Sequence, residues 1–103
     1  MASGILGTAS VSALTDTTVY TVPVGKTASV TISLCNRSSS DATKVRIALS
    51  TTSAADDNYI EYDANVPTNG ILERSAIVLG AGTKVIVRSV NGTISAVVFG
   101  IEE

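Results

Sequence analysis

The stretch that decides the fold is residues 59–80, which read Tyr-Ile-Glu-Tyr-Asp-Ala-Asn-Val-Pro-Thr-Asn-Gly-Ile-Leu-Glu-Arg-Ser-Ala-Ile-Val-Leu-Gly. Residues 59–63 alternate in polarity, which predicts a short strand that presents its carboxylates outward. The segment Pro67-Thr68-Asn69-Gly70 is a turn in which Gly70 can adopt a positive φ. A second strand follows over residues 71–79. Two strands joined by a short turn indicate an antiparallel sheet.

The composition points to the same class of fold. Val, Ile and Thr make up 35 of the 103 residues. Their β-branched side chains lose rotamer freedom in helices and pack well on a pleated sheet. A chain of this length forms one domain with one modest core. The sequence is therefore expected to be all-β.

Alternating apolar residues and turn signals divide the rest of the chain into further strands. The strands are expected over residues 17–22, 28–34, 44–49, 59–63, 71–79, 84–90 and 93–101. Asn91-Gly92 predicts a type I′ hairpin turn between the last two. About seven short strands are typical of a small antiparallel β-sandwich, either jelly-roll or Ig-like. The domain is expected over residues 16–103.

The last two strands carry apolar residues on both faces, at Ile86 and Val87 in one and at Val98 and Phe99 in the other. Such strands are covered on both sides. One face of each strand packs on the core. The other face is covered either because the strands are central in the sheet or because another subunit packs on it. The low charged content, 16% beside 45% hydrophobic residues, leaves a similar choice between a Ser/Thr-rich exterior and an exterior that meets other subunits.

Residues 1–15 match neither a helical nor a strand period, so an extended N-terminal arm is expected there. If the arm packs on a neighbouring subunit, its apolar side chains are the anchors. Adjacent strand residues point to opposite faces, so Glu73 and Arg74 cannot pair with each other, and one must face a neighbouring strand or chain. The candidate assembly-interface residues are Ile5, Leu6, Val11, Leu14, Arg37, Glu61, Asp63, Glu73, Arg74 and Phe99.

The usual means of catalysis are missing from the chain. With no His and one Cys, a Ser-His-Asp triad, a Cys-His pair and the common zinc sites are excluded. Cys35 is expected to be a buried structural thiol on the face of its strand opposite Leu34. Tyr59 and Tyr62 are candidates for stacking on a sugar, but strict alternation would place them on opposite faces. We expect no enzymatic activity and no cofactor.

A net charge of −2 argues against nucleic-acid binding, and no run of residues is long and apolar enough to span a membrane. Hard oxygen ligands suit calcium, so a divalent-cation site is conceivable at four carboxylates close in sequence. Their spacing matches no EF-hand loop, and a solvated acidic edge is the alternative. The four are Asp56, Asp57, Glu61 and Asp63.

Several segments resemble a family of small β-sandwich virion structural proteins of tailed bacteriophages, especially cyanophages and related marine phages. They are residues 19–26 (Val-Tyr-Thr-Val-Pro-Val-Gly-Lys), residues 34–37 (Leu-Cys-Asn-Arg), residues 59–80 and the ending Val-Phe-Gly-Ile-Glu-Glu at 98–103. The most specific part is Ile60-Glu61-Tyr62-Asp63 with the Pro67 to Arg74 segment after it.

This resemblance implies a virion component made in the host cytoplasm. The first expectation is a capsid decoration (cement) protein, a homotrimer that ties major capsid proteins together on the head surface. A tail, neck or fibre adaptor is the alternative, and a host-receptor or carbohydrate-binding module is a third possibility from another class.

Overall fold

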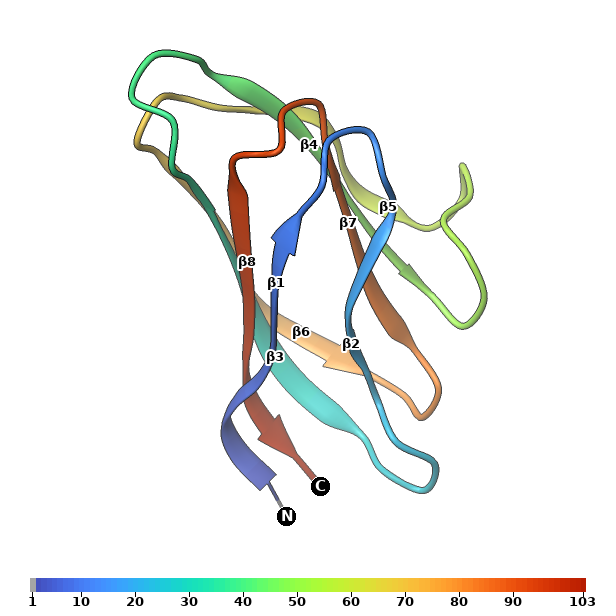
Figure 1. Ribbon diagram of the computed structural model, residues 1–103. Coiled ribbons are helices and arrows are strands. Elements are labelled where there is room, and N and C mark those ends of the chain that lie inside the picture. Colours follow the sequence, from blue (N-terminus) through green and yellow to red (C-terminus); the bar gives the residue numbers. More distant parts are fainter. Residues whose placement is uncertain (1) are drawn as a thin grey trace.

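The computed structural model describes residues 2–103, which fold into eight β-strands without a helix (Figure 1). The strands are β1 (Ala2–Val11), β2 (Thr17–Thr21), β3 (Ala28–Asn36), β4 (Thr43–Ser50), β5 (Tyr59–Val66), β6 (Ile71–Leu79), β7 (Lys84–Ser89) and β8 (Ile94–Glu102). They form a first sheet in the order β1-β8-β3-β6 and a second sheet in the order β2-β7-β4-β5. All pairs of named strands are antiparallel. The expected antiparallel β-sandwich is confirmed, and this strand order is that of a jelly roll.

The expectation of an N-terminal arm is wrong for Ala2–Val11, which form β1 at the edge of the first sheet. β1 pairs with β8 along its whole length, and Val11 is fully buried. A register shift between Ile5 and Gly7 interrupts the alternation, so these small residues carry no regular strand pattern. β1 therefore adds one strand to the seven that the sequence patterns predicted. Met1 lies outside the described residues.

The turns connect strands of different sheets, which the sequence patterns did not indicate. Among the strands of residues 2–103, β4 and β5 alone are consecutive in the chain and neighbours in one sheet, and their loop is the long one at residues 51–58. The predicted hairpin at Asn91-Gly92 is wrong, because β7 and β8 lie in different sheets and neither residue has a positive φ. The turn after β5 likewise crosses between the sheets.

Gly70 does not take the positive φ expected of it, whereas Asn69 does, at 54°. The reason for a glycine at position 70 is steric. A Cβ there would lie 2.6 Å from Cγ of Pro67. The turn therefore depends on close packing of its own residues.

The core fills the space between the two sheets. Inward residues of β3 at Ala28, Val30, Ile32 and Leu34 are buried, while the residues between them are partly exposed. β7 and β8 are central strands, each with a neighbour on both sides. Ile86, on the outer face of β7 by register, is still only 4% exposed, so the middle of β7 is covered on both faces within the single chain, while Lys84 and Arg88 on the same outer face are partly exposed.

One end of the sandwich is held together by the fully buried side chain of Asn36. Its Nδ2 donates to the carbonyls of Asp41 at 2.9 Å, Val66 at 3.3 Å and Pro67 at 3.2 Å. Its Oδ1 accepts from the Thr93 hydroxyl at 2.8 Å. One amide thus joins three connections between the sheets, and a buried amide needs such partners.

Candidate functional site

The outer face of the first sheet is almost free of charge. Its outward strand positions within residues 2–103 carry small hydroxyl and apolar side chains, with Glu73 as the one charged residue among them. The Arg37 guanidinium lies over one end of the face, and Glu103 borders the other. Arg37 donates to the hydroxyls of Ser10 at 3.2 Å and Ser95 at 2.9 Å. The outward residues include Ile5 and Thr8 of β1, Ser29, Thr31, Ser33 and Cys35 of β3, Ile71, Glu73 and Val78 of β6, and Val97, Phe99 and Ile101 of β8.

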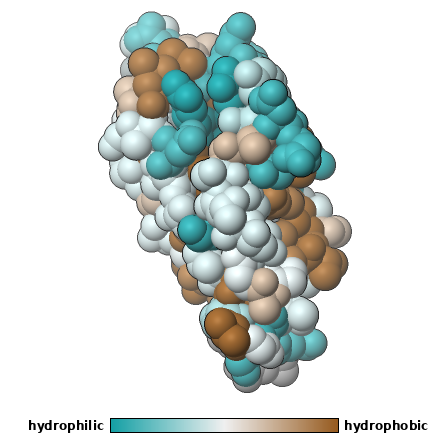
Figure 2. All heavy atoms as spheres, turned by 90° about the vertical axis from the view of Figure 1, so that its right-hand side faces the viewer, coloured by the Kyte–Doolittle hydropathy of each residue, from teal (hydrophilic) through white to brown (hydrophobic). Residues whose placement is uncertain are grey.

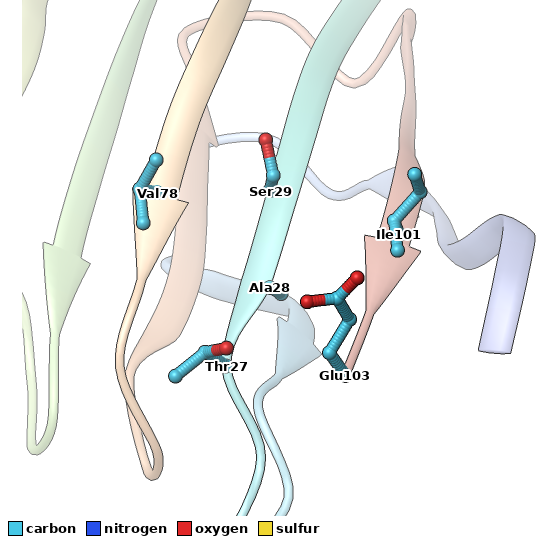
Figure 3. A pocket seen from close by; sticks show the side chains of 6 residues that line it. All are labelled: Thr27, Ala28, Ser29, Val78, Ile101 and Glu103. Carbon is cyan, nitrogen blue, oxygen red and sulfur yellow. The ribbon is translucent and has the colours of Figure 1, made fainter. Parts of the chain in front are cut away.

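A hollow of about 200 Å³ lies at one end of this face (Figure 3). Ser29 on β3 lies between Val78 of β6 and Ile101 of β8 in the register of the sheet. The small serine leaves a depression between two larger apolar side chains. Val78 is 77% exposed and Ile101 is 45% exposed, so these two apolar side chains face solvent. Glu103 also lines the hollow, with its carboxylate at the pocket (Figure 3). The hollow therefore combines apolar walls with one charged group, and its apolar part can accept an apolar side chain from another surface.

Four of the predicted interface residues lie on or over this outer face. Ile5 is 71% exposed and lies opposite the half-buried Phe99 on β8. Glu73 is exposed on β6 and forms no ion pair within residues 2–103. Arg37 lies over the end of β1 and β8. The sequence analysis missed Ile71, Val78 and Ile101, because alternation alone does not distinguish an outer apolar row from an inner one.

Val11 and Leu6 are not interface residues. Val11 is fully buried in the core, and Leu6 is half-buried and packs against it. Both point inward because β1 belongs to the sandwich and the register shift at Leu6 turns this side chain toward the core. Leu14 is exposed, with a positive φ of 56°, but lies beside the second sheet.

Arg74 pairs with Glu61 and links the two sheets across one open side of the sandwich. Glu61 lies on β5 and Arg74 on β6, the outermost strands on that side. Arg74 Nη1 also donates to the Ile60 carbonyl at 3.1 Å. Of the Glu73-Arg74 pair, Arg74 therefore faces a neighbouring strand and Glu73 faces outward.

Asp63 forms a two-pronged ion pair with Arg46 on the outer face of the second sheet. Arg46 Nε lies 2.8 Å from Oδ1, and Nη2 lies 3.3 Å from Oδ2. Hydrogen bonding to Arg46 lowers the pKa of Asp63 below its ordinary value, and the same bond raises the pKa of Arg46. The guanidinium carbon lies 4.1 Å above the ring centre of Tyr62, a cation–π contact. Arg46 is thus fixed by a carboxylate and a ring together.

The expectation that Tyr59 and Tyr62 lie on opposite faces is wrong. Their ring centres are 5.0 Å apart with an angle of 74° between the planes. The register of β5 against β4 shifts twice between Val45 and Ala48, and each β-bulge reverses the alternation. The shifts leave Ile60 as an extra residue and place both Tyr62 and Asp63 opposite Arg46. Tyr59, Tyr62 and Asp63 therefore gather on one side of the strand.

Basic side chains gather on the outer face of the second sheet. Arg88 lies directly opposite Arg46 in the register, and both border a small hollow with Lys44 and Leu14. Like charges in directly opposed positions disfavour the sheet, and Asp63 offsets part of this repulsion. Figure 2 views the molecule from the side of β2, β5 and β7, where strongly hydrophilic side chains gather in the upper half.

The described residues contain no grouped metal ligands. No three His, Cys, Asp or Glu side chains within residues 2–103 come close enough to share an ion. Glu61 and Asp63 turn toward different arginines, so the four carboxylates considered for calcium do not converge. Cys35 is a free thiol, half-buried on the outer face of the first sheet, and the expectation of a buried thiol is wrong.

Comparisons of the chain with protein-family models, with curated proteins and with solved structures gave no match. Within residues 2–103, no helix is long and apolar enough to cross a membrane.

Proposed function

We propose that this protein is a structural component of a bacteriophage particle, a decoration protein that attaches to the head and ties neighbouring major capsid proteins together. The observation that carries the proposal is the outer face of the first sheet. Two of its exposed apolar side chains, Val78 and Ile101, border a hollow, and the carboxylates on or beside the face are those of Glu73 and of Glu103, which lines the hollow. Such faces mark protein-interaction surfaces, because monomeric proteins rarely expose contiguous apolar area without a partner.

Two further arguments support a role in the particle. The jelly roll is an architecture that viral capsid proteins use repeatedly, although the fold alone does not define a function. The resemblance of residues 59–80 to phage virion proteins points to the same setting. The homotrimer expected for a decoration protein stays a prediction, which light scattering of the purified protein measures directly.

The test introduces charge into the proposed interface. Val78→Asp with Ile101→Asp places two carboxylates at the hollow, where both side chains are exposed, so the fold should tolerate them. Burying unpaired charges against a capsid protein costs several kcal/mol, so binding to particles that lack the protein should fall by about a hundredfold or more. Circular dichroism first establishes that the variant is folded.

Val90→Asp is the matched control. Val90 is 48% exposed, close to the 45% of Ile101, but lies beside the second sheet. This variant should bind particles like the unmodified protein. Equal binding by the double variant would contradict the proposed face. The position of bound protein in particle images distinguishes a head protein, spread in many copies, from a tail, neck or fibre adaptor present in few.

A further inference from the structure

A second surface feature does not contribute to the proposed assembly face. Asp56, Tyr59 and Tyr62 line an open hollow of about 450 Å³ where the β4–β5 loop joins β5. It lies on the outer side of the second sheet, the side of the sandwich opposite the first sheet's outer face. Any ligand bound here would not compete with a partner on that outer face.

The aromatic part of the hollow is exposed and yet held in place. Tyr62 is 57% exposed, and the Arg46 guanidinium packs on its ring at 4.1 Å. Arg46 is itself fixed by both oxygens of Asp63. Tyr59 packs edge-on against Tyr62, with ring centres 5.0 Å apart. Fixed binding groups lose little conformational freedom when a ligand arrives, which favours affinity.

The carboxylate of the hollow is carried by an ordered turn. The Ala55 amide donates to Asn58 Oδ1 at 2.9 Å, and the Asn58 amide donates to the Ala55 carbonyl at 3.1 Å. These bonds close the turn that contains Asp56 and Asp57. The hollow therefore offers the parts of two tyrosine rings that Arg46 and their mutual contact leave exposed, with their phenolic hydroxyls and a neighbouring hydrogen-bond acceptor.

The chemistry of these groups selects the class of ligand. An anionic ligand is disfavoured, because Asp56 lines the hollow and Asp57 follows it. A cationic ligand would gain little, because cation–π attraction is weak at exposed sites and Arg46 already packs on the Tyr62 ring. A pyranose sugar fits, since its C–H face can pack on a ring while its hydroxyls donate to a carboxylate. Tyrosine suits such a ligand because its ring is apolar and its hydroxyl is polar.

We propose that Asp56, Tyr59 and Tyr62 form a binding site for a neutral pyranose oligosaccharide. The site is independent of the proposed role in the particle, and purified protein alone suffices to test it. The probes are neutral glucose, galactose and N-acetylglucosamine oligomers, with sialyllactose and choline as the anionic and cationic comparators. The chain has no Trp, and two of its three Tyr line this hollow, so a change in its tyrosine emission can report on ligand binding there.

At least one neutral oligomer should bind and change the tyrosine emission. Tyr62→Ala should weaken that binding about tenfold or more, as truncation of a central aromatic contact does, while Tyr62→Phe keeps the ring and most of the affinity. Asp56→Ala should weaken it, and Asp57→Ala serves as the matched control because Asp57 does not line the hollow.

The proposal is overturned if no neutral oligomer binds, if sialyllactose or choline binds more tightly than every neutral sugar, or if Tyr62→Ala binds like the unmodified protein. The thermal unfolding transition of each variant is measured first, so that weaker binding by a folded variant is not confused with loss of the fold. Should Tyr62→Ala unfold, the comparison of Asp56→Ala with Asp57→Ala decides the question.

Discussion

At the scale of single residues, Gly7 shows how closely β1 and β2 approach each other. A Cβ at Gly7 would lie 2.2 Å from the Val19 carbonyl oxygen, a contact with rigid backbone. We expect Gly7→Ala to lower the free energy of unfolding by about 1–3 kcal/mol through overpacking. A urea titration of the purified protein measures the change.

The matched control is Gly80→Ala in the turn after β6. A Cβ there would meet nothing within 4 Å, and φ is not positive at this residue. The free energy of unfolding should stay the same or rise by up to about 1 kcal/mol, because alanine restricts the unfolded chain. An equal loss in both variants would show that the close contact with Val19 is not the cause.

Tyr20 links the core to the end of β8. Its hydroxyl should make the free energy of unfolding decrease with rising pH in the alkaline range. Its hydroxyl donates to Glu102 Oε2 at 2.7 Å. Burial, followed by this hydrogen bond, raises the pKa of Tyr20 from 10.0 to about 12. The unfolded chain therefore releases this proton at lower pH than the folded protein does. The contribution is complete below pH 10 and is lost as the pH rises toward 12.

The measurement is the melting temperature of the protein and of Tyr20→Phe from pH 9 upward. Lysine deprotonation affects both proteins equally, so the difference between their curves isolates Tyr20. The unmodified protein should lose melting temperature more steeply between pH 10 and 12. Parallel curves would mean that the Tyr20 pKa is the same in the folded and unfolded chains.

At the scale of elements, β1 is part of the sandwich, and its removal should unfold the domain. Its inward side chains Leu6, Ala9 and Val11 pack on the core, and its backbone pairs with β8. Each large apolar side chain that becomes exposed costs about 1.5–3 kcal/mol, against a total stability of about 5–15 kcal/mol for a typical domain. Deletion of residues 2–11 should abolish cooperative thermal unfolding followed by circular dichroism.

Ile5→Ser in the full-length chain is the control for this deletion. It removes the most exposed apolar side chain of β1 without touching the core, so the unfolding transition should remain. If the truncated protein still unfolded cooperatively, β1 would be a detachable arm after all.

Local patterns in the sequence predicted seven of the strands and the fold class, because alternation and turn residues act over a few positions. They could not predict which sheet each strand joins. Asn91-Gly92 favours a tight turn wherever it occurs, but the long-range pairing of β8 with β1 and β3 decides that the turn crosses between sheets. The bulges in β5 were equally invisible, since an extra residue such as Ile60 has no distinctive side chain. They bring Tyr59 and Tyr62 together, so the sequence could name these two residues as sugar-stacking candidates but could not predict that they lie side by side.

At the scale of the whole molecule, the two outer faces of the sandwich differ in chemistry. The first sheet presents small hydroxyl and apolar side chains with the carboxylates of Glu73 and Glu103 at its margins, and the second presents Lys44, Arg46 and Arg88 with the tyrosine pair at one side. The core lies between them, and packed sheets are separated by about 10 Å. A single small domain can therefore attach to a particle through one face while the other stays open to a second ligand.

This separation predicts that the two proposed activities are independent. Val78→Asp with Ile101→Asp should lose attachment to particles and keep saccharide binding, while Tyr62→Ala should do the reverse. Because the two sites share no residues and no hydrogen-bond network, the effects in the combined variant should add within about 0.5 kcal/mol. Titrations of all four proteins with particles and with the bound oligosaccharide measure both affinities. A change in saccharide affinity caused by the Val78 and Ile101 substitutions would reveal coupling through the core, which the placement of the two sites on different sheets gives no reason to expect.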